Sequence, residues 1–164
     1  MVIREIINRR SVRNYKKKEV SDKDLLEIIK AAQFAPTAHN NRSVEFIIIK
    51  NQNLKNKIYE IVGQEFVKKA PVLIVPTIDT EKTKWPTQDL SLATGNIFLQ
   101  AEALGLGTVW KNLNLKVRPL VIKLLRLPKN YAVINLIPVG YPSVKKRPHD
   151  NRDFKKKKIY YEQY

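Results

Sequence analysis

The stretch QDLSLATGNIFLQAEALGLGTVW, residues 88–110, decides the fold class of this protein. Apolar residues recur along it at the spacing of one helix face, and Pro86 suits the first turn of that helix. Gly105 or Gly107 suits its C-terminal end. The apolar face comprises Leu90, Ala93, Ile97, Ala101 and Leu104. So much apolar surface predicts a long helix that is buried within a layered domain.

Helix and strand patterns alternate on both sides of this segment. Ser21, with Asp24 three residues later, has the arrangement of a helix start. We expect strands over 44–50, 71–79 and 131–142, further helices over 21–36, 54–67 and 119–127, and a contribution to the core from 108–113. An α+β domain and an α/β domain both fit this order of elements.

The 164 residues carry a formal net charge of +16, which predicts encounters with anions, nucleic acid among them. The length fits one domain. The charge is concentrated at the ends, because residues 1–18 and residues 145–158 each have six more basic than acidic side chains. We interpret Lys16–Lys18 and Lys155–Lys158 as solvated surface, or as a field that draws anionic nicotinamide cofactors.

Several function classes are excluded by composition and motif. The chain has no cysteine and only two histidines, His39 and His149, so we expect no disulfide, thiol nucleophile or metal site. It has no signal-peptide pattern and no apolar run near the roughly 20 residues of a membrane span, so we expect a cytoplasmic protein. The glycines of LGLGTVW follow a helix and lack a third glycine, which excludes a dinucleotide loop.

Three segments have the composition of binding sites. RRSVRNY, residues 9–15, offers guanidinium and hydroxyl donors that suit one phosphate, with scattered surface arginines as the alternative. APTAHNN, residues 35–41, can present amide groups to a planar heterocycle, or serve as a plain connection. The tail 145–164 interleaves lysines with aromatic residues, which suits nucleic acid. Its IYYEQY end also suits an added strand that wraps a partner subunit, and its lysines suit a solvated face.

In their order along the chain, these segments resemble the FMN-dependent nitroreductase family, as a small, single-domain member. RRSVRNY is similar to the family's arginine–serine motif, and APTAHNNRSVEFIII to its proline, asparagine and strand segment. QDLSLATGNIFLQAEALGLGTVW is similar to its central helix and glycine turn. LPKNYAVINLIPVGYP and NRDFKKKKIYYEQY are similar to its last core strand and its tail.

The resemblance implies an α+β fold, with helices flanking a central, mostly antiparallel sheet, and an intertwined homodimer. Residues 1–164 would form one FMN-binding domain whose C-terminal extension, about 143–164, wraps the partner subunit. FMN at the interface would take hydride from NADH or NADPH and reduce a nitroaromatic, quinone or similar acceptor in a ping-pong cycle. Because the flavin carries the chemistry, no catalytic side chain is required.

The resemblance also assigns the residues around the flavin. Arg9, Arg10, Ser11 and Arg13 would bind the phosphate, the ribityl chain and the pyrimidine side. Arg152 would close on the phosphate from the tail.

The remaining assignments come from three other segments. The second subunit would contribute Pro36, Thr37, Ala38 and Asn40. The ring would lie along Val109, Trp110, Lys111 and Asn112, with a backbone N–H near Asn112 donating to flavin N5. Gln64 would reach the pyrimidine edge, and Tyr160 and Tyr161 would lie in the strand that embraces the partner.

The chain departs from the family pattern in three places. Arg42, Ser43 and Val44 replace a Gln-Pro-Trp sequence, and Asn112 and Leu113 replace two glycines. The stretch between Asp79 and Gln88 is short, which predicts a more open pocket. Two other functions fit the sequence: a basic nucleic-acid-binding protein, from the charge and the tail, and a flavin-binding protein without turnover, from the departures.

Overall fold

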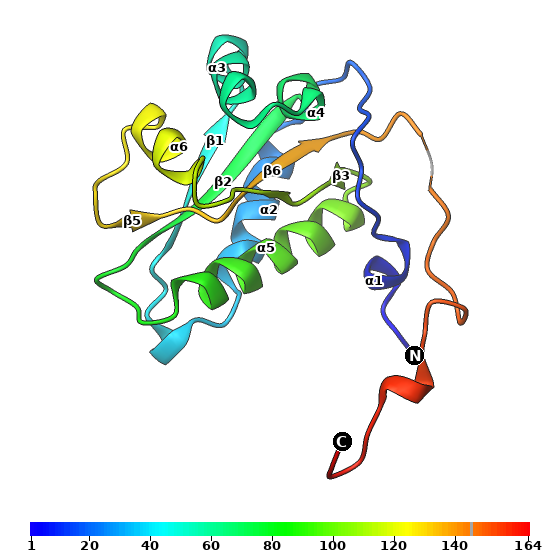
Figure 1. Ribbon diagram of the computed structural model, residues 1–164. Helices are drawn as coiled ribbons and strands as arrows, with labels where there is room; N and C mark the ends of the chain where they lie inside the picture. The colour runs from blue at the N-terminus through cyan, green and yellow to red at the C-terminus, as the bar shows by residue number, and fades with distance from the viewer. Residues whose placement is uncertain (145) are drawn as a thin grey trace.

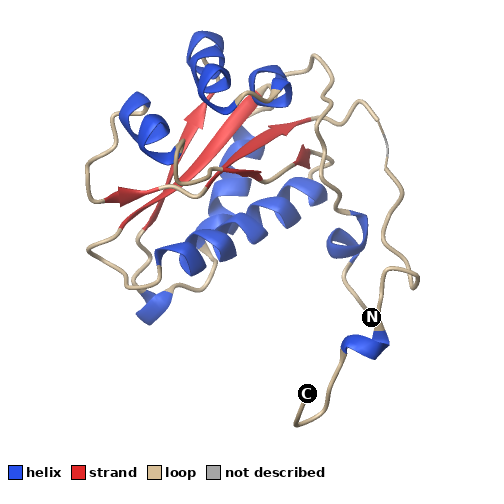
Figure 2. Ribbon diagram, in the orientation of Figure 1, coloured by secondary structure: helices blue, strands red, loops and turns tan. Residues whose placement is uncertain are grey.

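An antiparallel sheet forms the middle layer of the protein (Figure 2). The computed structural model describes residues 1–144 and 146–164. Its strands are β1 (Val44–Ile49), β2 (Val72–Asp79), β3 (Gly107–Thr108), β4 (Lys111–Asn112), β5 (Tyr131–Ala132) and β6 (Asn135–Gly140). They are ordered β1-β2-β6-β3, with β4 also paired to β6 and β5 to β2. The ladders between these strands are antiparallel, which confirms the predicted α+β class.

Two groups of helices cover the two faces of the sheet (Figure 1). One face is covered by α2 (Asp22–Gln33) and α5 (Pro86–Ala103), and the other by α3 (Gln52–Val62), α4 (Glu65–Lys69) and α6 (Arg118–Leu124). The short α1 (Arg4–Asn8) packs against α5. Two single turns of 3-10 helix, η1 (Ala38–Asn40) and η2 (Lys156–Lys158), complete the elements. The result is three layers, helices on sheet on helices.

Strand β2 lies at the centre and is buried along its whole length. Successive side chains of a strand point to opposite faces of the sheet. Val72 and Ile74 therefore join the hydrophobic cluster under α2 and α5, while Leu73 and Val75 join the cluster under α3, α4 and α6. Because the strand is buried on both faces, its sequence is a nearly continuous apolar run, and this run predicted the strand.

Helix α5 follows its prediction closely. It begins at Pro86 and ends at Ala103, and Gly105 then takes a positive φ of 71°. The side chains of Leu90, Ala93 and Ile97 are fully buried beneath the sheet. The predicted start of α2 is also confirmed, because the Asp24 backbone N–H donates to Ser21 Oγ at 3.0 Å.

The stretch 54–67 was expected to form one helix, and this prediction is wrong. The structure has two helices there, because α3 ends at Val62 and Gly63 adopts a left-handed conformation with a φ of 69°. Its N–H donates to the Tyr59 carbonyl at 2.7 Å and closes the helix. A glycine in this conformation is a common helix end, because a side chain there is strained.

The C-terminal tail leaves the body of the protein (Figure 1). Residues 154–164 are all exposed, and Ile159–Tyr164 form no strand in the single chain. These residues belong to the extension that was expected over 143–164, of which Lys145 lies outside the described residues. Within the part of the chain that is described, no helix is long and apolar enough to cross a membrane.

Gly107 allows the N-terminal segment to pack against the sheet. A Cβ at this position would lie 2.6–2.8 Å from three side-chain atoms of Val12. We predict that Gly107→Ala lowers the free energy of unfolding by about 1–3 kcal/mol, because the added methyl group overpacks this contact. Urea denaturation with tryptophan fluorescence measures the change.

The matched test repeats the substitution in a Val12→Gly background, where the three crowding atoms are absent. The cost of Gly107→Ala should then be much smaller. An equal cost in both backgrounds would show that the contact with Val12 is not the reason for the glycine.

Candidate functional site

The basic segment Arg9–Arg13 runs along the edge strand β3. The Val12 backbone N–H donates to the Thr108 carbonyl at 2.8 Å, and Ser11 forms a parallel bridge with Thr108. Val12 is buried against Gly107. Because side chains alternate along an extended chain, Ser11 and Arg13 lie on the side opposite to Val12.

The polar groups of this segment are open for a ligand. The Arg9 and Arg13 guanidinium carbons each lie 5.8 Å from an aromatic ring centroid, of Phe98 and Phe66 respectively. In the described part of the chain, no carboxylate lies within 4.0 Å of either guanidinium, and the Ser11 hydroxyl makes no hydrogen bond. Two arginines and a hydroxyl with free donors fit the phosphate group of FMN.

Arg10 differs from its neighbours, because its side chain holds the tail. Its Nη1 donates to the Arg147 carbonyl at 2.7 Å, and Lys146 Nζ donates to the Ser11 carbonyl at 2.8 Å. The His149 backbone N–H donates to the Ile7 carbonyl at 2.8 Å. The first part of the tail therefore lies along the basic segment. Sequence reasoning missed Lys146 and Arg147, which had no signal beyond their place in a basic run.

Arg152 is held by a carboxylate of its own segment. Its Nη2 lies 2.7 Å from Asp150 Oδ2, and its side chain is 78% exposed. The hydrogen bonds from Arg152 hold the pKa of Asp150 well below its usual range. Among the described residues, no contact joins Arg152 to Arg9, Ser11 or Arg13. Its contact with the flavin phosphate stays a prediction.

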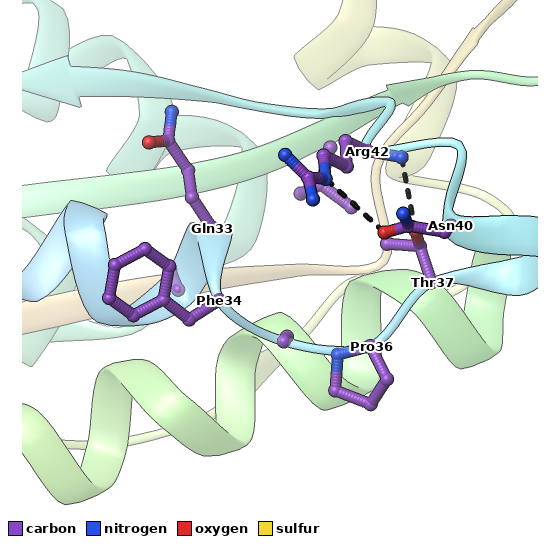
Figure 3. A pocket seen from close by; sticks show the side chains of 9 residues that line it. Gln33, Phe34, Pro36, Thr37, Asn40 and Arg42 are labelled. Carbon is purple, nitrogen blue, oxygen red and sulfur yellow. Dashed lines mark hydrogen bonds between the residues drawn. The ribbon is translucent and has the colours of Figure 1, made fainter.

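The loop that follows α2 surrounds a cavity of about 670 Å³ (Figure 3). Its wall includes Pro36, Thr37 and Asn40 from the predicted set, but Ala38 is not among the lining residues. Arg42 closes the loop, since its backbone N–H donates to Thr37 Oγ1 at 3.0 Å and its Nε to Asn40 Oδ1 at 3.2 Å.

Three residues in this loop have positive φ angles: His39, Asn40 and Arg42, at 50–53°. Side chains other than glycine seldom adopt this conformation, so the surrounding contacts must hold it.

The Asp89 carboxylate holds the loop in place. Its Oδ1 accepts from the Ala38 backbone N–H at 2.9 Å, and its Oδ2 accepts from the Thr83 hydroxyl at 2.9 Å. Asp89 is only 2% exposed and lies in the first turn of α5, where a negative charge is favoured by the helix dipole. Sequence reasoning missed Asp89, although an acidic residue in the first turn of a very apolar helix was a usable signal.

The segment after β3 carries the residues expected beneath the flavin ring. Val109 is buried, whereas Trp110 and Lys111 are half-buried and Asn112 is exposed. The Trp110 ring meets Phe98 edge to face, with centroids 6.5 Å apart. Because Phe98 also lies under Arg9, one aromatic side chain of α5 connects the basic segment with this one.

One departure from the family pattern is explained by burial. Leu113 is fully buried in the hydrophobic cluster under α6, and its N–H donates to the Ile134 carbonyl at 2.9 Å. Leu113 therefore contributes to core packing.

A buried asparagine, Asn135, lies opposite Asn112 in the β4–β6 ladder. Its Nδ2 donates to Thr94 Oγ1 at 3.1 Å, and its Oδ1 has no hydrogen-bond partner among the described groups.

Gln64 lies at the start of α4 and is exposed. Two residues later, the Phe66 ring lies under the Arg13 guanidinium. This contact brings α4 beside the basic segment. The structure thus places the basic segment, the β3–β4 segment and the start of α4 around one side of the sheet edge, while the loop at Pro36–Asn40 lies at the other end of α5.

The sequence of the chain is similar to those of known proteins. The model of the nitroreductase family matches residues 6–68 and 62–141. A protein of Archaeoglobus fulgidus provisionally named NADH dehydrogenase/NAD(P)H nitroreductase is 33% identical over 93% of this chain and 88% of its own length. An FMN reductase [NAD(P)H] of Bacillus subtilis is 29% identical over 87% of this chain and 66% of its own.

The fold is shared with solved structures. The FMN-dependent nitroreductase of Clostridium difficile R20291 superposes with a TM-score of 0.92 at 30% identity, over 98% of both chains. The family model alone covers most of the sequence, including the basic segment, the loop after α2 and the β3–β4 segment. The chain therefore belongs to the nitroreductase family.

Proposed function

We propose that this protein is an FMN-dependent oxidoreductase that uses NADH or NADPH to reduce nitroaromatic, quinone or similar acceptors. The observation that carries the proposal is that Arg9 and Arg13, which have no ion-pair partner among the described residues, lie beside the Ser11 hydroxyl on a nitroreductase scaffold. When bound, FMN would supply the redox chemistry: it would accept hydride from the reduced nicotinamide and pass it to the acceptor after the oxidised nicotinamide has left.

The residues of this chain bind FMN and orient it. Arg9, Ser11 and Arg13 hold the phosphate by charge-assisted hydrogen bonds, and their aromatic supports restrict where the guanidinium groups lie. Trp110–Asn112 form the wall for the ring, and a backbone N–H near Asn112 is the donor toward it. We assign Gln64, Arg10 and Arg152 to the outer part of this site.

We further propose that the enzyme is a homodimer in which Pro36–Asn40 of one subunit complete the site of the other. Helix α5 supports this, because Leu92 is 48% exposed and Phe98 and Leu99 are only half-buried in the single chain. The exposed aromatic residues of the tail, Tyr160 and Tyr161, pair with no strand among the described residues and are available to pack on a second subunit.

The first prediction concerns the cofactor. The purified protein should be yellow, should release FMN on denaturation, and should lose its visible flavin absorbance when mixed with NADH or NADPH without oxygen. Chromatography of the released flavin and anaerobic stopped-flow absorbance measure both properties. Flavin that is bound but never bleached would indicate a binding protein without turnover. A colourless protein that binds nucleic acid with a steep salt dependence would support the other alternative.

The second prediction concerns Arg13. Arg13→Ala should weaken FMN binding by about tenfold to a hundredfold, the range for losing one hydrogen bond between charged groups. The unfolding free energy of the apoprotein should change by less than about 1 kcal/mol, because Arg13 is exposed. Lys129→Ala removes one charge from the exposed loop after α6 and serves as the control. Fluorescence titration with FMN measures the affinities, and equal affinities for the two variants would remove Arg13 from the site.

The third prediction concerns the tail. Tyr160→Ser combined with Tyr161→Ser should weaken the dimer by at least about tenfold, because two aromatic side chains lose buried contact area. The control, Leu115→Ser, changes a 78% exposed side chain before α6 and should leave association unaltered. Sedimentation equilibrium over a dilution series gives the constants. A wild-type protein that is monomeric at all concentrations would refute the dimer.

A further inference from the structure

A second cavity, of about 350 Å³, lies away from the proposed flavin residues. It is enclosed by the segment Tyr15–Val20, the end of β1, the first turns of α3 and the junction between α4 and β2. Its wall includes six lysines and one glutamate: Lys16, Lys17, Lys18, Lys50, Lys55, Lys69 and Glu19. None of the residues assigned to FMN lines it. Its volume is at the lower end for ligand pockets, which favours a small ligand.

Lys55 is the buried member of this group, with only 4% of its surface exposed. Its Nζ donates to the carbonyls of Ala70 at 2.7 Å and Pro71 at 3.1 Å. Burial lowers the pKa of this ammonium group. An ammonium has three donors, so one remains for a ligand. A buried charge without a counter-charge is unfavourable, and an anion in the cavity would provide that charge.

The neighbouring carboxylates neutralise only part of the lysine charge. Asp22 pairs with Lys50, and Glu65 pairs with Lys69 at 3.2 Å. For Lys16, Lys17, Lys18 and Lys55, no carboxylate lies within ion-pair distance anywhere in residues 1–144 and 146–164. The Lys18 ammonium instead lies 4.0 Å from the centroid of the Tyr141 ring. Among the lining residues without an ion-pair partner in the described chain, four are therefore lysines and one is an acidic residue, Glu19.

We propose that this cavity binds a small oligophosphate, either inorganic pyrophosphate or the diphosphate of a nucleotide. Lysine binds phosphate as a mobile point charge, and several lysines can adjust to the oxygens of two adjacent phosphates. Each phosphate group carries about 1.5–2 negative charges at neutral pH, so two of them match the excess charge. The site also gives Lys16–Lys18 a role other than solvated surface or a diffuse field.

The test uses isothermal titration of FMN-saturated protein with inorganic pyrophosphate and, separately, with ADP, at constant ionic strength. The variant Lys16→Ala/Lys17→Ala/Lys18→Ala should raise the Kd for the bound probe by about tenfold or more. The control Lys156→Ala/Lys157→Ala/Lys158→Ala removes the same charge from the exposed η2 and should leave the Kd unchanged. Tight binding of pyrophosphate alone identifies the inorganic ligand, and tighter binding of ADP identifies a nucleotide.

A site-specific signal complements the affinities. The NMR resonance of the Lys55 ammonium should shift during the titration, because no other cavity lysine is buried. Equal weakening in both triple variants, an unmoved Lys55 signal, or displacement of FMN by pyrophosphate would each overturn the proposal. The titration can be repeated on apoprotein, so a failure of the FMN assignment is distinguished from a failure of this site.

Discussion

The packing of α5 on the sheet is the constraint on which the other parts of the structure depend. Its buried face, with Leu90, Ala93 and Ile97, fills one of the two cores. The site segments attach to the remaining surface: the loop after α2 through Asp89, and the basic and β3–β4 segments through Phe98. A rigid helix of 18 residues thus fixes the distances between groups that come from distant parts of the chain. A helix used on several sides in this way needs different side chains on each side: Leu90 and Ile97 toward the core, and Asp89 and Phe98 toward the attached segments.

The two phosphate-binding regions that we propose use different cations for different tasks. The arginines of the basic segment rest on Phe98 and Phe66, which limits their freedom and suits a cofactor that stays bound. The lysines of the second cavity are mostly exposed and long, which suits a ligand that exchanges. In the tail, by contrast, Asp150 and Asp153 neutralise neighbouring basic groups locally. The net charge of +16 is therefore distributed over surfaces for which we propose separate roles.

Much of the fold was predictable because its main elements have one dominant pattern. Helix α5, strand β2 and the cap at Ser21 all follow from periodicity and local hydrogen bonding. The break at Gly63 was not predicted, because the apolar spacing continues across it and only the glycine marks the end of α3. In the site, resemblance supplied Arg9, Ser11 and Arg13, but the contacts of Asp89 and Lys146 join residues 51 and 135 positions apart. Buried Lys55 was hidden for the same reason, because its partners lie in the next helix–strand junction.

The hydrogen bond between Asp89 and Ala38 also makes the shape of one loop depend on a distant element of the chain. The strained backbone of Pro36–Asn40 is held by a buried carboxylate that lies 51 positions further along the sequence. Closing so long a stretch of chain costs entropy, which the docking of α5 on the sheet helps to offset. The native shape of the loop therefore requires that α5 is docked. A locally unfolded chain can have an intact sheet and still lack the shape of this loop, which we propose completes the site of the other subunit.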